Sequence, residues 1–258
     1  MMKSLRGEVL GIVGGMGPLA SAEFLRTVYR CATWEREQDA PRVLMDSNPA
    51  FPDRTSAFLA GEEHTVSPML EEVLSALLQR GATRLVICCM TAHHLLPRLP
   101  AELRRPIISV PEVIVGQLRR ARGRYLMLCT KGTRYVSLFE REPGWEEVAD
   151  RVVFPGPDDQ DLVHDELIYQ IKRMADPAAL IPMVRSLLAR YGADGFIVGC
   201  SEIHLVANQL HGGAEHPECI DPFLAIASSF AHATEAAGHA TVDRILPLPG
   251  AMLRATAA

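Results

Sequence analysis

The sequence lacks the features that mark membrane, secreted and nucleic-acid-binding proteins. No apolar run reaches the roughly 18 residues that a helix needs to cross a bilayer. The opening residues 1–6 run into an expected strand without the pattern of a signal peptide. Lys and Arg are scattered, and the net charge is only −5, so no basic patch for nucleic acid is evident. We therefore expect a cytoplasmic protein with neither a membrane nor a nucleic-acid partner.

A disulfide framework is also missing, although the chain has six cysteines. Several of them lie at or beside the ends of expected strands, as in proteins of the reducing cytosol. The remaining composition is ordinary, with 48% apolar and 22% charged residues. A chain of 258 residues can form one large domain or two small ones with an ample core.

One pattern occurs twice, 111 positions apart. Gly81-Ala82 leads to an apolar strand that ends at Cys89, with His93 four residues later. Gly192-Ala193 leads in the same way to Cys200 and His204. A repeat of helix, turn, apolar strand and cysteine indicates a duplicated α/β unit. If the two units face each other, the two cysteines meet across one cleft.

The rest of the chain alternates between expected strands and helices, which favours parallel sheets with right-handed crossovers. We predict strands over 8–13, 42–45, 84–88, 107–109 and 196–199, and a strand that starts at Tyr125. We predict helices over 19–32, 63–80, 113–122, 162–174, 178–191, 202–210 and 223–237. Ligands of such folds bind beyond the carboxyl ends of the strands. The polar motifs lie there: 14–18, 46–54, 89–93, 130–133 and 200–202.

Cys89 and Cys200 are the candidate catalytic residues. A free cysteine is commonly a small buried hydrophobe, and we assign that role to Cys88 and Cys129. Cys89 and Cys200 instead stand where a strand gives way to a helix, whose N-terminus is expected to lower the pKa of a thiol. Two such thiols around one carbon can remove a proton from one face and return one to the other.

His93 and His204 could orient these thiols, or the two Cys/His pairs could bind zinc. Cys-x-x-x-His in two distant copies lacks the paired ligands of structural zinc sites, so we expect no metal. We therefore take both histidines as candidates to tune or orient the thiols. For His204, a position in the core is nearly as well supported.

The stretch Gly15-x-Gly17-x-x-Ala20 also fits a relaxed dinucleotide fingerprint. Asp46 could then be the acid that binds the ribose, but it stands further from the glycines than usual and leads into a proline-rich loop. We favour a carboxylate site made by the N–H groups of the glycine loop. Arg54, at the end of the loop 46–54, is a candidate carboxylate ligand, as is Lys172 on the helix 162–174.

Taken together, these stretches resemble the cofactor-independent aspartate/glutamate racemase family, and within it the aspartate-racemase branch. The resemblance is carried, in order, by 14–20, 51–55, 89–93, Gln160, 168–172, 199–202 and 221–222. It implies an α/β fold of two pseudo-symmetric three-layer domains with mainly parallel sheets and the active site in the cleft between them. We expect residues 1–112 plus 221–258 in the first domain and 113–220 in the second. It also implies a homodimer, a small carboxylate substrate and no cofactor.

The resemblance assigns roles to single residues. Cys89 and Cys200 become the acid/base pair, and Arg54 and Lys172 would hold the distal carboxylate. The residues Thr91, Thr130, Thr133 and Ser201 would hold the α-carboxylate, with Met16 and Met90 bordering the substrate. Asp46, Asn48, His93, Glu202 and His204 are expected behind them.

Met90 is the main departure from the family pattern, which has Asn there. A thioether is only a weak acceptor, so Met90 would leave the ammonium of an amino acid without a partner. We therefore expect a racemase or epimerase of an acidic amino acid or relative, with weak activity on free aspartate. The alternatives are an isomerase, decarboxylase or cyclase of another carboxylate, and a catalytically silent ligand-binding protein.

Overall fold

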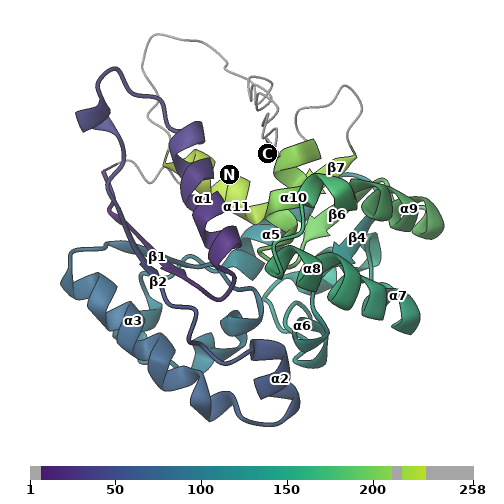
Figure 1. Ribbon diagram of the computed structural model, residues 1–258, viewed down its shortest axis with the longest axis horizontal. Coiled ribbons are helices and arrows are strands. Elements are labelled where there is room, and N and C mark those ends of the chain that lie inside the picture. Colours follow the sequence, from purple (N-terminus) through teal and green to yellow (C-terminus); the bar gives the residue numbers. More distant parts are fainter. Residues whose placement is uncertain (1–6, 211–216, 231–258) are drawn as a thin grey trace, which may run out of the picture.

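The computed structural model describes residues 7–210 and 217–230. Two parallel sheets organise this part of the chain (Figure 1). The first has the strand order β2-β1-β3, and the second has the order β5-β4-β6-β7. Every strand pair in both sheets is parallel. The predicted α/β class with parallel sheets is confirmed.

The first sheet and its helices come from the first half of the chain. The strands are β1 (Leu10–Gly14), β2 (Val43–Ser47) and β3 (Arg84–Ile87). The helices are α1 (Pro18–Cys31), α2 (Arg54–Leu59), α3 (Ser67–Gln79), α4 (Ala101–Arg104) and α5 (Val110–Leu118), with 3₁₀ turns at Glu37–Asp39, Glu63–Thr65 and Thr91–Arg98. Figure 1 shows α1 and α3 on opposite sides of the first sheet.

The second sheet has the strands β4 (Tyr125–Leu128), β5 (Val152–Val153), β6 (Gly195–Val198) and β7 (Glu218–Ile220). Its helices are α6 (Lys131–Tyr135), α7 (Pro157–Asp161), α8 (Tyr169–Lys172), α9 (Ile181–Tyr191) and α10 (Ile203–Leu210). Short 3₁₀ turns occur at Trp145–Glu147, Ala149–Arg151 and Pro177–Leu180, and Leu162–Ile168 is a π-helix. After β7, α11 (Pro222–Ser229) returns to α1, where the rings of Phe24 and Phe223 lie 5.5 Å apart.

The predicted repeat is present in the register of the sheets. β3 pairs with β1 as β6 pairs with β4, and β3 and β6 lie 111 positions apart. Gly81 and Gly192, which precede these strands, both have positive φ values of 97° and 56°. Glycine adopts this conformation without the steric cost that a side chain brings. Local turn chemistry therefore repeats along with the strands.

Several boundaries differ from the predicted ones. The expected strand 107–109 is reduced to a single bridge between Ile107 and Leu85, because Ser109 already caps α5 through the N–H of Glu112. The helix expected over 113–122 consequently starts and ends earlier. The helix expected over 162–174 begins as a π-helix, continues as α8 and ends at Lys172, and α11 is shorter than expected within the described residues. The remainder of that predicted helix lies outside them.

The glycine loop between β1 and α1 is shaped by close packing. Gly15 has φ +85°, and a side chain there would collide with the backbone of Asn48. Pro18 occupies the first turn of α1, where its missing N–H costs no hydrogen bond. The Ser21 hydroxyl accepts a hydrogen bond from the Gly15 N–H at 3.2 Å. The loop is thus held at the carboxyl end of β1, beside the loop that follows β2.

Candidate active site

The two predicted catalytic cysteines lie at matching places in the two sheets. Cys89 follows β3 and Cys200 follows β6, and their residues are only 6% and 5% exposed. The turns that carry them touch, because the Ser201 hydroxyl donates to the Cys88 carbonyl at 3.2 Å. The structure therefore brings together two thiol-bearing turns that are 111 residues apart in the sequence.

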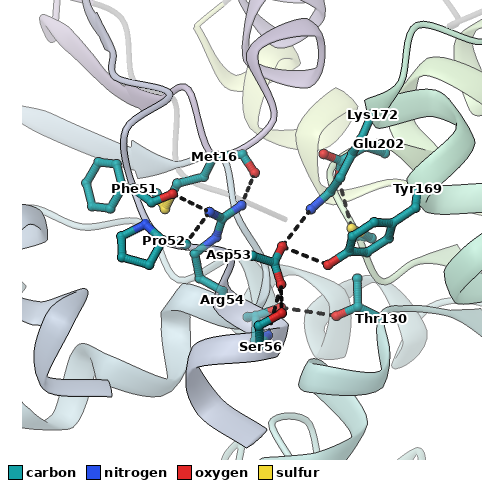
Figure 2. A network of polar contacts seen from close by, with 12 residues as sticks. Met16, Phe51, Pro52, Asp53, Arg54, Ser56, Thr130, Tyr169, Lys172 and Glu202 are labelled. Atoms are coloured by element: carbon teal, nitrogen blue, oxygen red, sulfur yellow. Dashed lines mark hydrogen bonds and ion pairs between the residues drawn. The ribbon is translucent and has the colours of Figure 1, made fainter. Parts of the chain in front are cut away.

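Arg54 stands beside Cys89. It begins α2, is 7% exposed, and donates from Nη1 to the carbonyl of Pro52 at 2.7 Å. A second guanidinium nitrogen donates to the carbonyl of Met16 (Figure 2). Burial would lower the pKa of Arg54, but the charge of Cys89 and a hydrogen bond to it outweigh burial, and the pKa is raised. The guanidinium thus joins the glycine loop to the Cys89 thiol.

Cys200 is paired with a carboxylate instead of a cation. Its Sγ donates to Oε2 of Glu202 at 2.9 Å. Burial raises the pKa of Cys200 well above its usual value, the Glu202 charge adds to this, and Lys172 opposes it. The sequence-based expectation of a lowered thiol pKa is wrong here, since desolvation and a neighbouring anion outweigh the start of α10. Cys200 therefore holds its proton at neutral pH.

Contacts of Asp53 with Tyr169 and Lys172 connect the two halves of the chain. Asp53 from the first half accepts a hydrogen bond from the Tyr169 hydroxyl at 2.7 Å, and Lys172 lies 3.9 Å from the same carboxylate (Figure 2). Burial would raise the pKa of Asp53, but the Ser56 N–H, the Tyr169 hydroxyl and the cations outweigh burial and lower it. The predicted cation Lys172 is thus already engaged by an acid of the protein.

The π-helix explains how Tyr169 and Lys172 reach this position. An added residue in a helical turn rotates the residues that follow, and such insertions are frequent at functional sites. Burial raises the pKa of the Tyr169 hydroxyl to about 12, and Asp53 adds to the rise while Lys172 opposes it. Tyr169 therefore stays neutral and serves as a hydrogen-bond donor.

Three predicted hydroxyls form a closed cluster. Thr91 Oγ1 lies 2.8 Å from Thr133 Oγ1 and 3.3 Å from Thr130 Oγ1, and Thr130 and Thr133 are 3.1 Å apart. Thr91 comes from the first half and the other two from the second. All three are buried. Rotation of their O–H groups can direct donors toward a carboxylate, which accepts from several hydroxyls at once.

The two predicted histidines have different surroundings. His93 Nδ1 is 3.0 Å from the carbonyl of Cys89, and its Nε2 accepts from the Val110 N–H at 3.3 Å. Nδ1 therefore carries the proton, and burial lowers the pKa of His93 to about 4. His93 orients the backbone of Cys89 as a neutral donor.

The His204 side chain contacts Asp221 and Thr27 instead of a thiol-bearing turn. Its Nδ1 is 2.6 Å from Asp221 and its Nε2 is 2.9 Å from Thr27 on α1. These contacts join α10 to α1 and α11, so His204 has the core position that the sequence left open. Met90 is also buried, and its carbonyl faces His93. Asp46 lies on β2 opposite Val13, and Asn48 packs against Gly15.

Sequence reasoning missed the roles of Asp53 and Tyr169. The two residues are 116 positions apart, and no local pattern pairs them. The available signal was Asp53 in the N-cap position, where it accepts from the Ser56 N–H at 2.9 Å.

Within the described residues, no three side chains of metal-binding type come together. Of the helices described, none combines the length and apolar character needed to cross a bilayer.

Comparisons with known proteins support the fold and identify the family. The family model described as Asp/Glu/Hydantoin racemase matches residues 13–230. An aspartate racemase from Picrophilus torridus has a similar structure, with a TM-score of 0.71 at 21% identity over 86% of this chain and 91% of that one. An aspartate racemase homologue from Pyrococcus horikoshii gives 0.62 at 19% identity, covering 86% and 99%. Glutamate racemase from Aquifex pyrophilus gives 0.52 at 20% identity, covering 86% and 87%.

Proposed function

The chain belongs to the Asp/Glu/hydantoin racemase family, and we propose that it is a cofactor-independent racemase or epimerase of an acidic amino acid or a related carboxylate. We place it in the aspartate-racemase branch and assign the proton transfer to Cys89 and Cys200. The observation that carries this proposal is the contact between the two thiol-bearing turns, from Ser201 to the Cys88 carbonyl at 3.2 Å.

The two thiols have different partners, which suggests their roles in one direction of the reaction. The Arg54 guanidinium stabilises the negative charge that the Cys89 sulfur carries as a base. Cys200 holds its proton against Glu202 at 2.9 Å. The Cys89 sulfur takes the proton from the substrate carbon, and the Cys200 S–H returns a proton to the opposite face. The reverse direction exchanges these roles.

Substrate binding uses the remaining polar groups. The cluster of Thr91, Thr130 and Thr133 offers hydroxyl donors to the α-carboxylate. Arg54 Nε, which has no hydrogen-bond partner among the described residues, and Lys172 Nζ are the donors for a distal carboxylate. Binding of that carboxylate would compete with Asp53 for Lys172.

We further propose a homodimer of two-domain subunits in the cytoplasm, with the division at residues 112/113 and 220/221 and the substrate between the domains.

Incorporation of solvent deuterium tests the proposal. The wild-type protein is incubated in D₂O with single enantiomers of acidic amino acids and with related diacids, and deuterium at the carbon next to the carboxylate is measured by NMR. Cys89→Ala and Cys200→Ala should each abolish inversion, while one of them can still exchange the proton of one enantiomer. Cys31→Ala, which removes a thiol outside the site, is the matched control. Full inversion in either active-site variant would exclude two-thiol transfer.

A further inference from the structure

One oxygen of Glu202 has no partner. The Glu202 side chain belongs to a residue that is only 2% exposed. Its Oε2 accepts from Cys200 Sγ at 2.9 Å and faces the Ser201 hydroxyl at 3.1 Å. Its Oε1 is buried and has no hydrogen-bond partner among the described residues. An ionised carboxyl group accepts hydrogen bonds on both oxygens, and a buried acceptor left without a donor is costly.

The position of Oε1 is defined by the glycine loop. A Cβ atom built on Gly17 would lie 2.1 Å from this oxygen, so a side chain at position 17 would displace the Glu202 carboxylate. The carboxylate of the second half of the chain thus reaches the loop that Arg54 holds through Met16. Because both oxygens belong to one carboxyl group, Oε1 lies directly beside the Cys200 thiol.

The nearby cations do not occupy this oxygen. Arg54 and Lys172 both interact electrostatically with Glu202, yet neither forms an ion pair with it among the described contacts. Both cations point toward other groups in Figure 2, Arg54 toward backbone carbonyls and Lys172 toward Asp53. Among the described residues, neither of these cations therefore supplies the donor that Oε1 lacks.

We propose that Glu202 Oε1 binds the α-ammonium group of the substrate, and that the protein therefore selects α-amino acids over dicarboxylates and hydroxy acids of the same length. The inference rests on the proposed function in one respect, since it places the reacting carbon next to Cys200. An ammonium is bonded to that carbon, and a charge-assisted hydrogen bond to a buried carboxylate is among the strong ones.

Charge balance supports the same choice. A dicarboxylate without an ammonium would bring two negative groups to a site that already contains the Glu202 carboxylate. Like charges in a poorly solvated site disfavour each other. An amino dicarboxylate brings a positive group that can pair with Glu202 Oε1, an acceptor without a donor among the described residues. Paired with Glu202, the ammonium also stays protonated, which makes the adjacent carbon more acidic. Glu202 thereby supplies the partner that Met90 does not offer.

Binding measurements test this directly. The dissociation constants of DL-aspartate and succinate are measured by calorimetry for the wild type and for Glu202→Gln. DL-aspartate is used because racemisation cannot change its composition, and succinate differs only by the missing ammonium. Glu202→Gln should weaken aspartate about tenfold or more while succinate binds as well as before or better. Equal effects on the two ligands would overturn the proposal.

Two further variants serve as controls. Glu202→Asp keeps the carboxylate and should retain part of the preference for aspartate. Ser201→Ala removes a neighbour of Oε2 but not the charge at Oε1, so it should change both ligands equally. If Glu202→Gln does not fold, as judged by circular dichroism, the dissociation constants of DL-aspartate, succinate and DL-malate are compared for the wild type alone. Malate or succinate binding as tightly as aspartate would then overturn the proposal.

The outcome is separable from that of the proposed function. A preference for aspartate that depends on Glu202, without deuterium exchange in any ligand, would support this inference and contradict the proposed racemase activity. Exchange in a dicarboxylate or hydroxy acid but in no amino acid would do the opposite.

Discussion

Replacement of Arg54 tests how the glycine loop and the Cys89 turn are held together. Arg54→Leu keeps most of the apolar stem but removes the guanidinium, which donates to the carbonyls of Met16, Phe51 and Pro52. A buried acceptor that loses its donor costs about 1–3 kcal/mol. Since one of these bonds is long, at 3.4 Å, we expect a total loss of about 2–5 kcal/mol in the free energy of unfolding.

The assay is thermal and urea unfolding followed by circular dichroism. For a chain of this size, 1 kcal/mol corresponds to about 2–4 °C in the melting temperature. Arg54→Leu should therefore melt about 4–20 °C below the wild type. The control is Arg26→Leu, which breaks a surface pair with Glu23 in which the arginine side chain is 37% exposed. Pairs of that kind contribute about 0–1 kcal/mol.

Two results would refute this reasoning. If Arg54→Leu were as stable as Arg26→Leu, the guanidinium would not be the bridge that the hydrogen bonds describe. If the folded variant retained the KM and kcat of the wild type for its best substrate, that substrate would have no distal carboxylate at Arg54. A rise in KM together with a fall in kcat is the expected result, because the same guanidinium faces Cys89.

Three further predictions concern neighbouring residues. Lys172→Met should raise the KM for a dicarboxylate less than Arg54→Leu does, because Asp53 already pairs with the lysine at 3.9 Å. The control is Lys131→Met, at a partly exposed lysine that pairs with Asp161 and Asp165. Met90→Asn should change the affinity for aspartate by less than about threefold if Glu202 binds the ammonium; a large gain in aspartate turnover would instead support the sequence-based role of Met90. His93 has its pKa lowered from 6.5 to about 4 in the fold, so unfolding takes up a proton between these values. The free energy of unfolding should therefore be highest above pH 6.5 and should fall as the pH is lowered toward 4. Urea unfolding should show a fall that is about 3 kcal/mol larger in the wild type than in a His93→Asn variant.

Much of the architecture could be predicted from the sequence because its signals are local. Apolar runs that end at glycine, cysteine or threonine locate the carboxyl ends of parallel strands, where polar groups collect. The offset of 111 residues correctly located β3 and β6, together with their positive-φ glycines. The family match confirms the prediction of an isomerase. The strand expected over 107–109 was wrong because the Ser109 cap and Pro111 start a helix at that point.

The properties of the site depended on the tertiary structure. The bond between Asp53 and Tyr169 joins residues 116 positions apart, so it exists only because the two halves of the chain lie together in the fold. The same meeting buries Cys200 beside Glu202, which reverses the expected direction of its thiol pKa. It also leaves Glu202 Oε1 without a partner beside Gly17. Sequence by itself determined which residues carry reactive groups and which strands present them. Only the fold decided how each group is solvated and which charge lies next to it, because both depend on contacts between distant parts of the chain.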